Sequence, residues 1–154
     1  KFAMKVSKQN WDGDNEPTII KKINDTNFNN CDLINARVLE GVEINMNKEK
    51  VIVMEMADGN ILDLYNKLSR KSPPQLRINK ICDITYKCTE IIECIFNNKI
   101  GYIDIKLENF LYKGRYGHSD FKILLGDLGS ICGQYGDLRS YTSTYAYYIK
   151  EKHF

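Results

Sequence analysis

The succession of strand-like and helix-like patterns in this chain of 154 residues predicts an α+β fold. Short apolar runs typical of strands dominate the first third, and the clearest of them is Val51 to Met56. A helical periodicity, with apolar residues recurring at intervals of three and four, then extends from Leu76 to Asn98. The two patterns meet at Ala57 to Asn60. We therefore expect a strand-rich part, residues 1–57, followed by a mainly helical part, residues 58–154.

The strand-rich part contains patterns for a small antiparallel sheet and one helix. Phe2 to Val6 and Leu33 to Glu43 favour two strands in addition to the buried one, and the polar residues Asn45 to Glu49 favour a hairpin turn. Glu16 to Ile23 favours a short helix, because Pro17 is tolerated in a first helical turn and the isoleucines share one face.

The second part is predicted to contain two helices and then two short strands. Ile61 to Leu68 favours a helix that must end before Pro73-Pro74, because proline excludes the preceding residue from helical geometry. The long helix between residues 76 and 98 has an apolar face. Phe110 to Tyr112 and Phe121 to Leu125 then favour two strands around a polar turn.

Charge and hydropathy indicate a soluble protein with no evident nucleic-acid or membrane partner. The net charge is +2, from 22 basic and 20 acidic residues that are scattered along the chain without a polybasic arm. No apolar run approaches the roughly 18 residues that a membrane span needs. We therefore expect neither nucleic-acid contact nor membrane association.

The cysteines suggest free thiols. The sequence has five, at positions that include no CxxC pair and fit neither a zinc site nor a disulfide framework: Cys31, Cys82, Cys88, Cys94 and Cys132. We therefore expect them to be reduced and structural, in a reducing compartment such as the cytoplasm.

Four polar residues after the long helix have the spacing of a phosphoryl-transfer site. Asp104 is followed by Lys106 and Asn109, and Asp127 stands in an Asp-Leu-Gly sequence 23 residues after Asp104. This arrangement places an acceptor for a hydroxyl proton, a phosphate-binding cation and a metal ligand on one tight loop, with a second metal ligand held before a glycine. Positioned phosphoryl transfer requires these groups.

In its motifs and their order the chain resembles the eukaryotic-type protein kinase family, of the Ser/Thr kind, from the strand lysine of the small lobe to the end of the activation segment. The resemblance implies a two-lobe fold that binds ATP and Mg²⁺ at the junction of the lobes. It makes Asp104 the catalytic base and Lys106 the lysine that steadies the γ-phosphate. Asn109 and Asp127 become the two Mg²⁺ ligands.

The same resemblance assigns a nucleotide site. Ala3-Met4-Lys5 stands where the family has its strand lysine, so Lys5 would contact the α and β phosphates of ATP and pair with a helix glutamate, Glu16 or else Glu40. The strand ending at Met54 would lead into the hinge. The residues implied to line the adenine pocket are Glu55, Met56, Ala57 and Leu111.

The chain departs from the family pattern just before the base. Tyr102 and Ile103 replace the usual His-Arg, so the arginine that receives an activation-loop phosphate is missing. We therefore expect activity not to require phosphorylation of Ser140 to Thr144. Thr144 stands where Ser/Thr-specific enzymes carry a threonine, and Lys150 replaces the usual proline.

These features predict an ATP-dependent protein kinase that acts on Ser/Thr hydroxyls of a protein substrate, since Lys106 is typical of enzymes with protein substrates. A pseudokinase that binds nucleotide or serves as a scaffold is the alternative, and a small-molecule phosphotransferase is a third possibility. The sequence contains no glycine-rich loop before Lys5 and no further helical lobe after Glu151. We therefore expect this sequence to correspond to an internal piece of a kinase domain, or to a reduced kinase.

Overall fold

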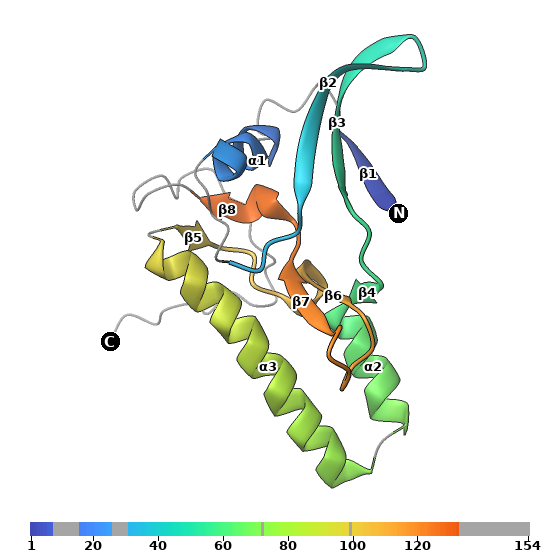
Figure 1. The fold of residues 1–154 in the computed structure, drawn as a ribbon, viewed down its shortest axis with the longest axis vertical. Helices are drawn as coiled ribbons and strands as arrows, with labels where there is room; N and C mark the ends of the chain where they lie inside the picture. Colours follow the sequence, from blue (N-terminus) through green and yellow to red (C-terminus); the bar gives the residue numbers. More distant parts are fainter. Residues whose placement is uncertain (8–15, 26–30, 72, 99, 133–154) are drawn as a thin grey trace, which may run out of the picture.

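The α+β mixture expected from the sequence is present in the computed structural model of the protein (Figure 1). The structure describes residues 1–7, 16–25, 31–71, 73–98 and 100–132. Within these residues it has three α-helices and three small antiparallel sheets, ordered β1-β3-β2, β4-β6-β7 and β5-β8. The kinase-like arrangement implied by the motifs stays a prediction.

The first sheet is built from the strands expected in the first part of the chain. β3 (Asn47–Glu55) lies in the middle, with β1 (Phe2–Ser7) and β2 (Ala36–Ile44) antiparallel on either side. β2 and β3 project from the molecule as a long hairpin (Figure 1). Its turn is only Asn45-Met46, and both residues have positive φ, as a two-residue hairpin loop requires. The strands are therefore longer than the polar sequence suggested.

The prediction that β2 starts at Leu33 was wrong. Residues 32–34 pair with β7 (Lys122–Leu125) instead, through hydrogen bonds from the Ile34 N–H to the Leu125 carbonyl and from the Leu125 N–H to the Asp32 carbonyl, at 2.9 and 2.8 Å. Apolar alternation alone cannot tell which neighbour a strand segment joins. This segment ties the first sheet to the second half of the molecule.

Helix α1 (Glu16–Asp25) confirms the short helix predicted at this position. Pro17 occupies its first turn, and Ile20 is buried against the core. The acidic side chain of Glu16 lies at the positive end of the helix dipole. The helix contacts β2 and the short helical turn η2 (Leu128–Ser130), so Glu16 is carried toward the second half.

The junction predicted at residues 57–60 runs directly along the second sheet. The Asp58 N–H donates to the Tyr112 carbonyl at 2.9 Å, and the two-residue strand β4 (Gly59–Asn60) pairs with β6 (Phe110–Lys113). Helix α2 (Ile61–Lys71) starts at once, because the side chain of Asn60 accepts from the Asp63 N–H at 2.8 Å. α2 ends before Pro73, as expected.

Helix α3 (Pro74–Asn97) is the long amphipathic helix of the prediction, with a proline in its first turn. Ile84, Cys88, Ile91 and Ile95 are buried, but Ile78 is 53% exposed, because the first turns extend beyond the core (Figure 1). None of the helices in the described residues carries an apolar stretch long enough for a membrane crossing.

The buried side chains form one continuous cluster that includes residues from both halves. It joins Ile20 and Ile52 of the first part to Ile95, Phe110 and Leu125 of the second. The two-stranded sheet of β5 (Gly101–Tyr102) and β8 (Ile131–Cys132) lies next to α1 and closes this core (Figure 1). The segment from β5 to β8 contains the motifs predicted to be catalytic.

The prediction that all cysteines are reduced was wrong for two of them. Cys31 and Cys94 form a disulfide with a Cα–Cα distance of 5.6 Å. Their separation of 63 residues hid the pair, because sequence spacing shows no through-space distance. Cys82 and Cys88 carry free thiols, and the side chain of Cys132 lies outside the described residues. Cys31 and Cys94 therefore no longer support the expectation of a reducing compartment.

Candidate active site

The predicted catalytic loop lies between β5 and β6 and is tied together by its own polar side chains. The amide nitrogen of Asn109 donates to the main-chain carbonyl of Asp104 at 2.8 Å and to its carboxylate at 3.0 Å. The Lys106 ammonium lies 2.6 Å from the same carboxylate. The spacing read from the sequence thus brings the expected base, cation and amide together.

Asp104 and Asn109 are buried, with exposed fractions of 6% and 7%. A buried carboxylate is costly unless donors surround it, and here the amide and the ammonium supply them. The hydrogen bond to Asp104 raises the pKa of Lys106, so this lysine stays protonated throughout the physiological range. The loop therefore holds a carboxylate acceptor beside a fixed positive charge.

Asp127 follows β7 and stands directly beside this loop. Its backbone is left-handed, with φ 43° and ψ 60°, a conformation that Asp tolerates better than most residues. The hydroxyl of Ser130 donates to its carboxylate at 3.3 Å. The Gly126 N–H donates to the Asn109 carbonyl at 2.8 Å, so the two predicted metal-ligand segments are joined through their main chains.

Gly126 also explains the position of Leu111. A Cβ on Gly126 would lie 2.8 Å from the nearest Leu111 side-chain carbon, so only glycine allows this contact without a shift. Leu111 is half-buried on β6, two residues past Asn109. Its placement next to the Asp127 segment fits the adenine-pocket lining that the resemblance implied for Leu111, and that role stays a prediction.

The predicted partner of Lys5 is present. The Lys5 ammonium forms an ion pair with Glu16 and lies 3.9 Å from Asp127. Glu16 is only 4% exposed, and Gly129 packs on it so closely that a Cβ there would lie 3.1 Å from the Glu16 Cβ. The other candidate, Glu40, pairs with Lys21 on the surface, where that lysine lowers the pKa of Glu40.

Three of the four residues predicted to line the adenine site, Glu55, Met56 and Ala57, lie at or just after the end of β3. The main-chain N–H of Met56 donates to the Lys1 carbonyl at 3.3 Å, and the Met56 side chain is half-exposed. Partial burial opposes ionisation of Glu55, but hydrogen bonds from Lys113 and from the Asn35 N–H lower its pKa overall. The Glu55 side chain therefore links the end of β3 to Asn35 and to Lys113 of β6. Ala57 lies two residues past the end of β3.

Tyr102 is the residue whose importance the sequence did not reveal. Its side chain is buried, and burial raises its pKa, with the carboxylates of Asp127, Asp104 and Glu16 raising it further. The hydroxyl is buried beside Asn109 without a hydrogen bond of good geometry among the described residues. Tyr102 thus places a buried aromatic ring two residues before Asp104, at the position where the kinase resemblance implies a histidine. The only available signal was its position two residues before Asp104.

A metal ion would find two ligands here. The Asp127 carboxylate is 38% exposed, and the Asn109 amide uses its nitrogen for Asp104, which leaves its oxygen to face a cation. No group of three or more His, Cys, Asp or Glu side chains gathers among the residues that the structure describes. Proteins commonly hold Mg²⁺ by one or two side chains together with substrate phosphates, so Asp127 and Asn109 are the residues that would hold it here.

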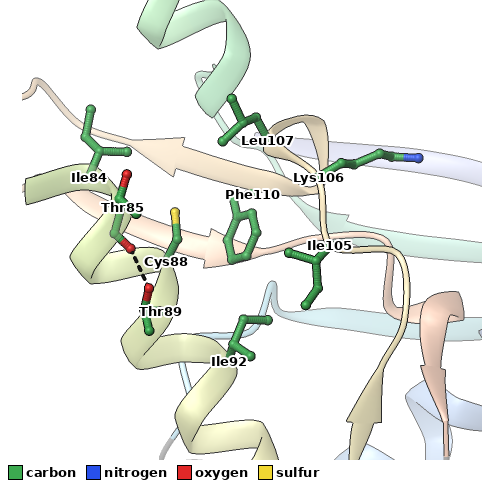
Figure 2. A pocket seen from close by; sticks show the side chains of 9 residues that line it. All are labelled: Ile84, Thr85, Cys88, Thr89, Ile92, Ile105, Lys106, Leu107 and Phe110. Atoms are coloured by element: carbon green, nitrogen blue, oxygen red, sulfur yellow. Dashed lines mark hydrogen bonds between the residues drawn. The ribbon is translucent and has the colours of Figure 1, made fainter. Parts of the chain in front are cut away.

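An apolar groove of about 360 Å³ lies on one side of the loop, between the loop and α3 (Figure 2). Aliphatic and aromatic side chains line it, among them Ile92, Ile105, Leu107 and Phe110. Figure 2 shows the Lys106 side chain running away from the groove, so its ammonium does not face this space. The groove is therefore separate from the polar cluster.

The expectations for Ser140 to Thr144 and for Lys150 fall outside the described residues. No family model and no curated protein matches this sequence. The functional interpretation accordingly depends on the residues of the chain itself.

Proposed function

We propose that this chain forms the catalytic part of an ATP-dependent protein kinase that transfers the γ-phosphoryl group to Ser or Thr hydroxyls of a protein substrate. One observation carries the proposal. Among the described residues, the buried polar and charged side chains are Glu16, Asp104 and Asn109, and the kinase resemblance had assigned a role to each of them. Burying such groups costs stability, so their convergence favours a functional site.

The ion pair between Lys5 and Glu16 supports the same proposal. In protein kinases the pairing of the strand lysine with the helix glutamate must be in place for activity. Here the pair is formed, and the Lys5 ammonium also lies beside Asp127. Gly129, in the helical turn that follows Asp127, packs closely on Glu16 of α1. These contacts support the proposal of a competent site.

The proposed reaction moves one proton and one phosphoryl group. The substrate hydroxyl oxygen forms a bond to the γ-phosphorus while the bond from that phosphorus to the β–γ bridging oxygen breaks, and Asp104 accepts the hydroxyl proton. Lys106, fixed 2.6 Å from Asp104, offers its charge to the transferring oxygens. Lys5 binds the phosphates that stay on the nucleotide. Asp127 and Asn109 would hold Mg²⁺, which offsets the charge of the phosphates.

Calorimetric titration and thermal unfolding with Mg-ATP test the proposal. At about 100 times its dissociation constant the nucleotide should stabilise the chain by roughly 2.7 kcal/mol. Asp127→Ala and Lys5→Ala should each weaken this effect strongly. Lys21→Ala is the matched control. It breaks an exposed ion pair with Glu40 and lies on α1, the helix that carries Glu16, the partner of Lys5. Equal losses in the Lys5 and Lys21 variants, or no binding by the wild type, would overturn the site.

The pseudokinase alternative is favoured by one observation, the Tyr102-Ile103 pair in place of His-Arg. Transfer of radiolabel from ATP to a generic Ser/Thr substrate separates the two proposals. If the wild type binds Mg-ATP and transfers nothing, the scaffold function replaces the catalytic one.

A further inference from the structure

The disulfide of Cys31 and Cys94 joins two segments that are far apart in the sequence, and its two cysteine residues differ in exposure. Cys31 precedes the segment that pairs with β7 and is only 9% exposed. Cys94 is half-buried near the C-terminal end of α3. An incoming thiol would therefore reach the Cys94 sulfur more easily than the Cys31 sulfur.

A hollow of about 400 Å³ leads to Cys94. Its lining carries charges of both signs, from Lys87 and Lys122 and from Asp32 and Glu90. This volume lies in the range of small-molecule sites, and the mixture of cations and carboxylates complements a ligand that carries both carboxylates and an ammonium. Tripeptide thiols of the glutathione kind have this chemistry.

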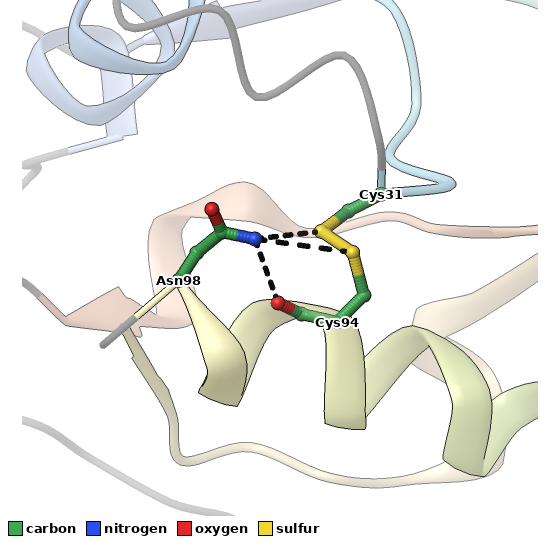
Figure 3. The surroundings of a disulfide bond; sticks show 3 residues. All are labelled: Cys31, Cys94 and Asn98. Carbon is green, nitrogen blue, oxygen red and sulfur yellow. Dashed lines mark hydrogen bonds between the residues drawn. A yellow bond between two sulfur atoms is a disulfide. The ribbon is translucent and has the colours of Figure 1, made fainter.

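A hydrogen-bond donor stands at the bond itself (Figure 3). The side-chain nitrogen of Asn98 lies 3.5 Å from the Cys31 sulfur and 3.9 Å from the Cys94 sulfur, and it donates to the Cys94 carbonyl at 2.8 Å. A donor beside a sulfur stabilises the thiolate, and thiol–disulfide exchange is faster when the leaving sulfur is the better thiolate. Asn98 is closer to Cys31, the sulfur that would leave.

We propose that the Cys31–Cys94 disulfide is a site of reversible thiol–disulfide exchange with a small charged thiol that enters through the hollow at Cys94. The thiolate forms a bond to the Cys94 sulfur while the bond to Cys31 breaks, and the electron pair leaves on Cys31 as a thiolate held by Asn98. A second thiol then attacks the sulfur of the bound thiol, which releases the Cys94 thiolate and a small disulfide. Two thiols thereby supply the two electrons. This site is independent of the proposed kinase activity.

The first test maps the intermediate. The folded chain is treated with graded glutathione, quenched with acid, alkylated and analysed by peptide mass mapping. We expect the mixed disulfide on Cys94 and the alkyl group on Cys31. The adduct on Cys31 instead, a mixture of both in equal amounts, or reaction only after the chain is unfolded in urea would overturn the proposal.

The second test asks whether the hollow selects the thiol. The Lys87→Gln/Lys122→Gln variant should react about three- to tenfold more slowly with glutathione and at the wild-type rate with neutral 2-mercaptoethanol. Lys50→Gln, on the distant hairpin, is the control and should change neither rate. Equal slowing with both thiols would show that the lysines act on the fold and not on the ligand.

Asn98 is a positioning residue in this scheme. Asn98→Ala should slow exchange about tenfold with both thiols, because the donor to the leaving sulfur is lost. Asn98→Gln keeps an amide donor and should recover part of the rate. An unchanged rate in Asn98→Ala would contradict the role of this donor.

Discussion

Asp104 is a buried carboxylate held by two donors, the amide of Asn109 and the ammonium of Lys106. Asp104→Asn keeps the size of the side chain but removes the proton acceptor. General-base contributions are typically about 10² to 10⁴ in rate, so transfer should fall by that factor while ATP affinity changes little. Radiolabel transfer and calorimetric titration of the same variant measure both quantities. Asp120→Asn, on an exposed turn, should leave both unchanged.

The buried hydroxyl of Tyr102 should contribute little to stability. Tyr102→Phe keeps the ring in the core and removes a buried hydroxyl that has no well-formed hydrogen bond. The free energy of unfolding should stay constant or rise by up to about 1 kcal/mol, whereas Tyr102→Ala should lower it by about 3–5 kcal/mol. Urea denaturation measures these values. A clear loss of stability in Tyr102→Phe would mean that the hydroxyl is satisfied in solution.

The free thiols should differ in reactivity. Burial raises the pKa of Cys88 to about 11, and Cys82 is exposed. Since the thiolate is the nucleophile, a pKa about two units above the ordinary value lowers its fraction about a hundredfold below pH 9. Iodoacetamide at pH 8 should therefore label Cys82 and spare Cys88, and labelling of Cys88 should increase only as the pH approaches 11. Rapid labelling of both at pH 8 would show that α3 opens locally.

At the scale of elements, the position of α1 depends on the contact between Gly129 and Glu16. Gly129→Ala places a Cβ 3.1 Å from the Glu16 Cβ, so Glu16 has to shift by a few tenths of an ångström, and we expect a loss of about 1–3 kcal/mol in stability and weaker binding of Mg-ATP. Gly41→Ala is the control. It has open space but a φ of 67°, so it should cost stability through backbone strain while nucleotide binding is retained. If both variants bind equally well, α1 does not govern the site.

At the scale of the whole molecule, the sequence predicted most elements because their patterns are local. The strand at Val51, the helix at Glu16 and the loop from Asp104 to Asn109 each carry their signal within a few residues. What it missed depends on distant partners. Leu33 joins β7 and not β3, Cys31 meets Cys94, and the side chain of Tyr102 is buried. The pairing of Lys5 with Glu16 was predicted only because the kinase resemblance supplied the long-range contact.

The disulfide connects the segment before β2 to the end of α3 and should therefore stabilise the whole molecule. In the chain-entropy description, closing a loop with a sequence separation of 63 residues stabilises the fold by about 4 kcal/mol. Without the bond, that segment is held by two main-chain hydrogen bonds between Ile34, Asp32 and Leu125 of β7 and by the burial of Ile34 in the core. Cys31→Ala/Cys94→Ala should therefore unfold at much lower urea concentration, and reduced wild type should behave like this variant. Cys82→Ala, which removes an exposed free thiol, should match the wild type. Equal stability of the double variant and the oxidised wild type would show that the β7 pairing and the shared core hold the two halves together without the disulfide.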